Sequence, residues 1–128
     1  MLKLKDFLQR WGFAILMMAA IFGFSSRPNN ELPNFGSVDS LVKKGGHMIG
    51  YALLGLSYWR GLELKRNKVW LAWLLAILYA ITDEFHQTFV PGRHPSPWDV
   101  MIFDNLGAMI GLLVYAIFKK KFAGNKQR

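Results

Sequence analysis

The sequence predicts an all-α membrane protein with four transmembrane helices and both termini in the cytoplasm. Three observations lead to this fold class. Of the 128 residues, 52% are hydrophobic, and they gather in four runs separated by polar or proline-rich segments. The basic residues are spread unevenly among those segments. The length fits one domain, residues 1–128, and the absence of cysteine excludes disulfide frameworks, thiolate metal sites and thiol nucleophiles.

The first predicted span covers residues 7–26. Its central part, Trp11 to Phe24, carries no charge, and with Phe7 it approaches the roughly 20 residues that cross a bilayer. Pro28 disfavours helix at Arg27 and ends this span.

The second predicted span covers residues 41–60, where the apolar run is shorter. Lys43, Lys44 and Arg60 can extend their charged ends toward water from such a helix. The third span covers residues 69–90 and is apolar to Ile81, after which Thr82 begins a polar stretch.

The fourth predicted span covers residues 98–118 and has its polar residues in its first half. Before it, residues 91–97 contain three prolines and one glycine, so they are predicted to be non-helical. Gly107 and Gly111 are spaced for close helix packing.

A soluble bundle is the main alternative fold. Its helices would show polar residues every three or four positions, whereas these runs are apolar on all faces. A single domain of this length could not bury four such helices. The net charge of +8 would also suit nucleic-acid binding, but its distribution favours a topology signal, and no nucleic-acid partner is predicted.

The basic residues predict the topology. Twelve of the sixteen Lys and Arg residues lie in the N-terminal segment, the loop at 60–68 and the C-terminal tail. The positive-inside rule places these three segments in the cytoplasm. The segments at 27–40 and 91–97 are then predicted to lie at the outer face.

With this topology, polar residues from three spans reach the outer side at one depth. On the second span Lys44, His47 and Tyr51 share one helical face. On the third span Asp83 and Gln87 share a face in the same way. Ionisable groups near hydrocarbon persist when they face a partner, water or a ligand. We therefore expect one outer pocket formed from Lys44, His47, Tyr51, Asp83, Glu84, Gln87, Arg93, Asp99, Asp104 and Asn105.

Each of these residues also has an ordinary structural interpretation. Asp99 or Ser96 can cap the start of the fourth helix, and Asp83 can pair with Lys44 or Arg93. The shared depth of so many polar groups favours a site. Of Asp83 and Glu84, which point about 100 degrees apart on a helix, we expect Asp83 to face the pocket.

Three chemistries fit such a site. Arg93, Lys44 and His47 can donate to an anionic headgroup. A metal-dependent hydrolase is an alternative, because Asp, Glu and His side chains bind metal ions, although no zinc motif is present. A proton-coupled transporter is the third, and four short spans would then need to oligomerise. The sequence assigns no catalytic residue, metal or cofactor and leaves open whether the protein is an enzyme.

Several motifs resemble the VanZ-like family of bacterial membrane proteins. The most specific is Asp83-Glu84-x-x-Gln87-x-Phe89-x-Pro91-Gly92-Arg93, followed by Ser96, Asp99 and Gly107-x-x-x-Gly111. Two further segments fit the same pattern, namely Ser25-Ser26 and Lys44-x-x-His47-x-x-x-Tyr51-x-x-Leu54. The family pattern has an Asn or Asp four residues after the helix-starting Asp, whereas here Asp104 follows Asp99 by five and Asn105 comes next.

The resemblance implies a multi-pass protein of the bacterial cytoplasmic membrane. The family takes its name from a protein associated with resistance to teicoplanin, a glycopeptide antibiotic that bears a lipid. That association implies action at the outer face in a cell-envelope context. The predicted partners are membrane lipids and a lipid-linked cell-wall precursor or a lipoglycopeptide, and the transporter alternative adds a second copy of the chain.

Overall fold

The protein is mainly helical in the residues that its structure, a computed structural model, describes. These residues are 3–27, 36–92, 98 and 100–125. They form four long helices, α1 (Leu4–Ser25), α2 (Asp39–Gly61), α3 (Val69–Gln87) and α5 (Asn105–Asn125). Short helical turns precede three of them, namely η2 (Gly36–Val38), η3 (Arg66–Lys68) and the wider π-helical turn η4 (Val100–Asp104). The predicted all-α class is confirmed.

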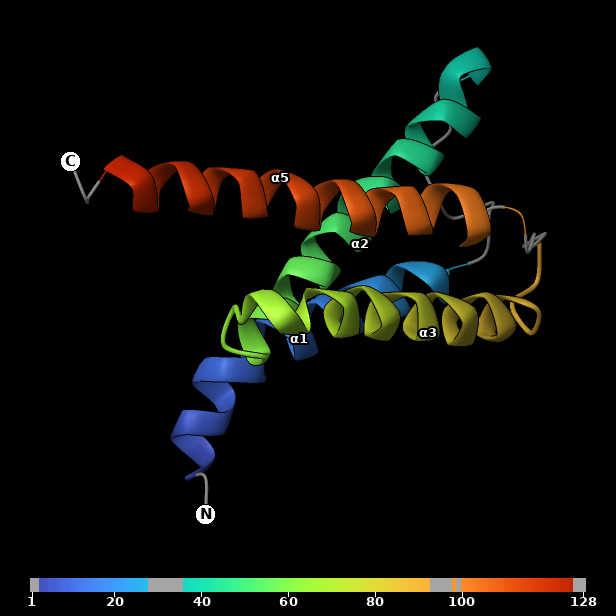
Figure 1. Cartoon of the computed structure of the whole chain (residues 1–128). Helices are drawn as coiled ribbons and strands as arrows, with labels where there is room; N and C mark the ends of the chain where they lie inside the picture. The colour runs from blue at the N-terminus through green and yellow to red at the C-terminus, as the bar shows by residue number, and fades with distance from the viewer. Residues whose placement is uncertain (1–2, 28–35, 93–97, 99, 126–128) are drawn as a thin grey trace.

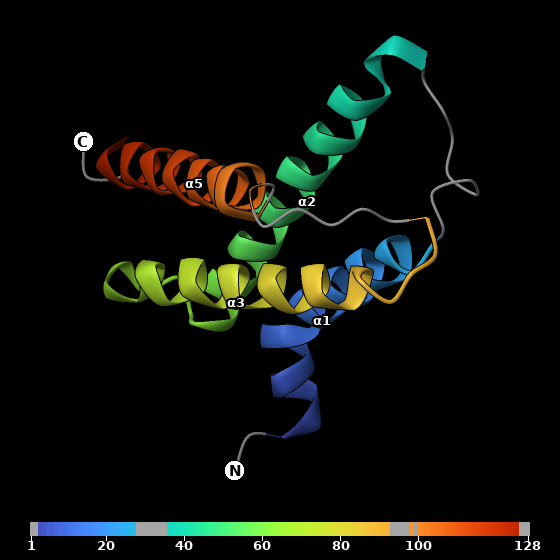
Figure 2. The ribbon, with the colours of Figure 1, turned by 90° about the vertical axis from the view of Figure 1, so that its right-hand side faces the viewer.

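The central element is α2, which contacts the other three long helices. In Figure 1 and Figure 2 it crosses obliquely between α3 and α5. Its side chains supply much of the core, because Tyr51, Leu54 and Trp59 are almost fully buried. The position of α2 decides where polar groups can be sheltered from lipid.

One face of α3 consists of small residues followed by polar ones. Ala72, Ala76 and Ala80 recur every fourth residue and are all buried, as expected for one stripe of a helix. The same stripe continues through Asp83 and Gln87, which are also buried. The helical repeat therefore carries a carboxylate and an amide from an alanine-lined contact into the protein interior.

The close packing predicted for the fourth span is present between α5 and α2. A Cβ atom added to Gly107 would lie 2.8 Å from Met48 Cα, and one added to Gly111 would lie 2.8 Å from Ala52 Cβ. Both glycines therefore meet α2 at backbone distance, which brings the polar start of α5 close to the polar half of α2.

Three helical segments of the described chain are long and apolar enough to cross a membrane: Leu4–Ser25, Arg66–Gln87 and Ile102–Lys120. Large exposed apolar side chains on α1 and α5, such as Leu16, Phe22 and Leu113, suit contact with lipid. The segment α2 is not among the three. It contacts the other three long helices, and its crossing of a membrane remains a prediction.

At the other end of α2, three side chains donate hydrogen bonds to backbone carbonyls of its last residue and of the turn before α3. The guanidinium of Arg10 donates two hydrogen bonds to the carbonyl of Gly61, at 2.8 and 3.1 Å. Trp59 donates to the carbonyl of Lys65, and Lys119 donates to that of Leu64. These bonds satisfy carbonyls at the helix end and tie α1 and α5 to the turn.

Glu63 lies in the same turn and pairs with two cations. Its carboxylate lies 3.0 Å from the ammonium of Lys65 and 3.4 Å from the guanidinium of Arg10. The hydrogen bond to Lys65 and the two positive charges lower the pKa of Glu63. Basic residues at this end of the bundle therefore also hold the acidic side chain of the turn.

Candidate functional site

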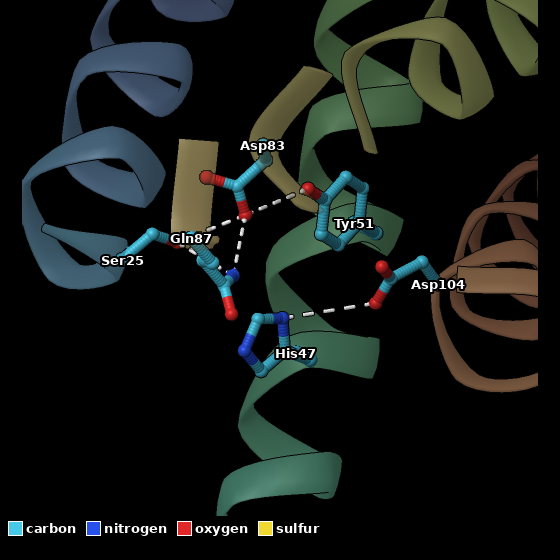
Figure 3. A network of polar contacts seen from close by, with 6 residues as sticks. All are labelled: Ser25, His47, Tyr51, Asp83, Gln87 and Asp104. Atoms are coloured by element: carbon cyan, nitrogen blue, oxygen red, sulfur yellow. Dashed lines mark hydrogen bonds and ion pairs between the residues drawn. The ribbon is translucent and has the colours of Figure 1, made fainter. Parts of the chain in front are cut away.

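A buried carboxylate joins three helices at one end of the bundle. One oxygen of Asp83, Oδ2, accepts hydrogen bonds from Ser25 Oγ at 2.9 Å, Gln87 Nε2 at 3.1 Å and the Tyr51 hydroxyl at 3.4 Å. Figure 3 shows these side chains converging from α1, α2 and α3. We call Ser25, Tyr51, Asp83 and Gln87 the carboxylate network.

The local sequence explains why these groups meet. Ser25 is the last residue of α1, and Gln87 stands one helical turn after Asp83. All four side chains of the carboxylate network are buried, and hydrogen bonds replace the hydration that these polar groups lose on burial. Gln87 Nε2 also lies 3.3 Å from Ser25 Oγ, which ties the amide to the hydroxyl.

The three donors meet only one of the two carboxylate oxygens. The other, Asp83 Oδ1, is buried and makes no hydrogen bond within the described part of the chain. Ser25 and Tyr51 donate hydrogen bonds from their hydroxyl groups to Oδ2. Their oxygen atoms therefore retain lone pairs that can accept hydrogen bonds from other partners. The network therefore presents hydrogen-bond acceptors to its surroundings.

A second polar pair stands beside the network. His47 Nδ1 lies 3.7 Å from Asp104 Oδ1, and the carboxylate of Asp104 is buried while His47 is one-quarter exposed. The ring of His47 stacks on that of Tyr51 with centroids 6.3 Å apart. In Figure 3, Nε2 lies on the edge of the ring that faces away from Asp104. In its protonated form, His47 can therefore donate from Nε2 while Asp104 faces Nδ1.

The wide turn η4 separates the roles of Asp104 and Asn105. Asp104 ends this turn and faces His47 on α2. Asn105 begins α5 and accepts a 2.7 Å hydrogen bond from the indole of Trp73 on α3. Wide π turns recur at functional sites, and this one directs the carboxylate toward the polar cluster and the amide toward a helix contact.

A pocket of about 400 Å³ lies between α1 and α2. Its volume falls in the range of small-molecule sites, roughly 300–1,000 Å³. Ser25, His47 and Tyr51 belong both to its wall and to the polar groups just described. Its full lining is Ala20, Ile21, Phe24, Ser25, Val42, Lys43, Gly46, His47, Gly50 and Tyr51.

The structure brings together five of the ten residues predicted for the site: His47, Tyr51, Asp83, Gln87 and Asp104. Glu84 is half-buried and does not belong to the carboxylate network. Arg93 and Asp99, with the predicted cap Ser96, lie outside the described residues.

Two predicted site residues face elsewhere. The ammonium of Lys44 lies 4.9 Å from the centre of the Phe103 ring, so it packs on η4 and does not line the pocket. Asn105 bonds to Trp73 and also lies outside the pocket lining. Consecutive helix positions diverge by about 100 degrees, which is why Lys43 lines the pocket and Lys44 does not.

Sequence reasoning did not include Ser25 or Lys43 among the site residues. Ser25 closes the first apolar run at the depth where the other polar groups gather, and that depth could have indicated it. The neighbouring Ser26 contacts His86 Nε2 at 2.9 Å, and His86 stacks on Phe22. The pair Ser25-Ser26 thus makes polar contacts with α3 through both hydroxyls.

No group of three His, Asp or Glu side chains within the described ranges is arranged to hold a metal ion. The polar side chains at this end of the described chain instead form the His47–Asp104 pair and the carboxylate network. The arrangement can orient hydroxyls and an imidazole toward a ligand in the adjacent pocket.

Comparison with known proteins identifies a family. Residues 7–119 match the family model described as VanZ/LLP1. Comparisons with curated proteins and with solved structures found no match. The matched range runs from α1 into α5 and includes every residue of the carboxylate network. The chain therefore belongs to the VanZ/LLP1 family.

Proposed function

We propose that the protein binds an amphiphilic molecule of the bacterial cell envelope at the outer face of the cytoplasmic membrane. The polar part of that molecule lies against Ser25, His47 and Tyr51. The observation that supports this is the sharing of these three residues between an apolar-walled pocket and a set of buried polar groups. Polar groups in a membrane protein are costly unless they serve a partner, water or a ligand.

The side chains around the pocket favour a headgroup with both an anionic group and hydroxyl or amino groups. Lys43 and protonated His47 can donate to the anion. The Ser25 and Tyr51 hydroxyls donate hydrogen bonds to Asp83. Their oxygen atoms can therefore accept hydrogen bonds from the hydroxyl or amino groups of the ligand. Membrane phospholipids, lipid-linked cell-wall precursors and lipoglycopeptides combine such groups. Membership of a family linked to glycopeptide resistance is consistent with this choice.

The location at the outer face depends on the topology. The N-terminal segment, residues 60–68 and the C-terminal tail carry twelve of the sixteen basic residues, and the positive-inside rule favours the cytoplasm for all three. Reporter fusions after Arg66 and after Gln127 should therefore report the cytoplasm, and a fusion after Asn34 should report the outside. An external reporter after Gln127 would contradict both the four-span topology and the outer location of the pocket.

Substitution of His47 tests the proposed binding of a lipid headgroup. Replacing His47 with Gln should reduce retention of phosphatidylglycerol by the purified protein about tenfold, because a hydrogen bond to a charged group is worth roughly 1.5–3 kcal/mol. Native mass spectrometry of protein released from lipid nanodiscs measures the retained lipid.

The matched control is His86→Gln. His86 is an imidazole near the same end of the bundle, but it contacts Ser26 and Phe22 and does not line the pocket. This variant should retain phosphatidylglycerol as the unchanged protein does. Equal losses in the two variants, or no loss in His47→Gln, would contradict headgroup recognition at the pocket.

A further inference from the structure

We infer that the pocket between α1 and α2 holds one alkyl chain of a membrane lipid whose phosphate lies at Lys43 and His47. This inference rests on the proposed function for the headgroup and adds the class of ligand. The chain-binding part stands on separate observations, which concern the apolar wall of the pocket.

Apart from Ser25, Lys43, His47 and Tyr51, the residues that line the pocket are apolar or glycine. Ala20, Ile21 and Phe24 of α1 face Val42 of α2, and Gly46 and Gly50 complete the surface of α2. Because the glycines stand one helical turn apart, α2 has no side chains there to fill the space against α1. The pocket is therefore formed by missing side chains and is not a gap between polar loops.

Two measurements describe the space beside these glycines. A Cβ atom added to Gly46 would meet nothing within 4 Å. One added to Gly50 would meet only Ile21 Cγ1, at 3.9 Å, which is an ordinary contact. A methyl group at position 46 would therefore lie in open space beside the pocket wall.

The surroundings of α1 point to a lipid as the occupant. The wall residues Ala20, Ile21 and Phe24 belong to Leu4–Ser25, a segment long and apolar enough to cross a membrane. Lipid alkyl chains surround such a segment in a membrane, and they fill an apolar space more favourably than water does. A volume of about 400 Å³ leaves room for one chain alongside the polar residues.

The polar residues at the pocket favour a lipid with a particular headgroup charge. Lys43 lines the pocket together with His47, and the described lining includes no carboxylate. Phosphate is a good partner for a lysine ammonium and a protonated imidazole. A lipid with a phosphate headgroup can therefore place its charge on α2 and one chain between α2 and α1.

The test uses the full chain in nanodiscs that contain phosphatidylglycerol with a photoactivatable diazirine on one acyl chain. After irradiation, cross-links should map to residues 20–25 and 42–51. Replacing Gly46 with Leu fills the pocket and should lower cross-linking at these residues about tenfold.

Gly45→Leu is the matched control for this variant. A Cβ atom at Gly45 also meets nothing within 4 Å, but Gly45 does not line the pocket. Both substitutions replace a helical glycine by the same better helix former, so they should change stability alike. Cross-linking in Gly45→Leu should equal that of the unchanged protein. Cross-links spread over the exposed faces of α1 and α5, unchanged by Gly46→Leu, would overturn the inference.

A second probe tests the phosphate separately. A diacylglycerol with the same photoactivatable chain, which lacks phosphate, should cross-link several-fold less than phosphatidylglycerol. Equal cross-linking by the two probes would overturn the assignment of phosphate. If Gly46→Leu lowers cross-linking while His47→Gln leaves lipid retention unchanged, chain binding stands and the proposed headgroup recognition fails.

Discussion

Replacing Asp83 with leucine should destabilise the protein by several kcal/mol. Oδ2 of this carboxylate accepts hydrogen bonds from Ser25, Tyr51 and Gln87, which come from three helices. Leucine removes the acceptor, and each buried donor left without a partner costs about 1–3 kcal/mol. Thermal unfolding of the purified protein in detergent, followed by circular dichroism or size-exclusion chromatography, measures the loss.

Asparagine at the same position should separate stability from binding. Its carbonyl oxygen can replace Oδ2, so the fold should persist with a much smaller loss of stability. The amide NH₂ then takes the position of Oδ1, however, so a buried hydrogen-bond acceptor beside Ser25 and Tyr51 becomes a donor. Retention of phosphatidylglycerol should therefore fall about tenfold in Asp83→Asn, with insertion in the membrane preserved.

Thr82→Leu serves as the control for both variants. Thr82 precedes Asp83 and is exposed, and its hydroxyl donates only to the backbone carbonyl of Tyr79. This variant should retain both stability and lipid. If Asp83→Asn is as unstable as Asp83→Leu, or if it binds lipid normally, then Asp83 serves only to hold the helices together.

The helices were predictable because hydrocarbon imposes a strong composition on a span. The level of each residue along the bundle could also be predicted, since apolar runs fix which residues lie near their ends. That reasoning placed Asp83 and Gln87 at the same level as His47 and Tyr51. The structure shows these four residues with their side chains in or beside one polar cluster.

The rotation of each helix about its axis could not be predicted in the same way. A shift of one residue separates Lys43, which lines the pocket, from Lys44, which packs on Phe103. The wide turn η4 adds a further rotation, so that Asp104 and Asn105 face different helices. Apolar runs that are uniform on all faces carry no information about which side meets a neighbour.

The central position of α2 was also beyond the sequence argument. Its shorter apolar run was interpreted as a span whose charged ends extend toward water. The structure places α2 in contact with α1, α3 and α5. The position of Ser25 at the end of the first apolar run indicates its level, but the sequence does not reveal that its hydroxyl binds Asp83.

Replacing Gly107 or Gly111 with alanine should destabilise the protein, even though alanine favours helix by about 1 kcal/mol over glycine. The added methyl group at Gly107 would meet the Met48 backbone, with Cα at 2.8 Å, and the one at Gly111 would meet Ala52 at 2.8 Å. Backbone atoms cannot rotate away, so α5 must separate from α2. Overpacking of this kind costs about 1–3 kcal/mol, and leucine should cost more than alanine.

Gly12→Ala and Gly23→Ala provide controls with the opposite expected sign. Both glycines lie within α1, and a Cβ atom at either meets nothing within 4 Å. Alanine there should leave thermal stability in detergent unchanged or raise it slightly, because only helix propensity changes. The separation forced by Gly107→Ala should also move Asp104 away from His47 and lower lipid retention, since Asp104 ends the turn that leads directly into α5. If Gly107→Ala were as stable as Gly12→Ala, the close contact of α5 with α2 would be wrong, and the polar pair that depends on it would lose its structural basis.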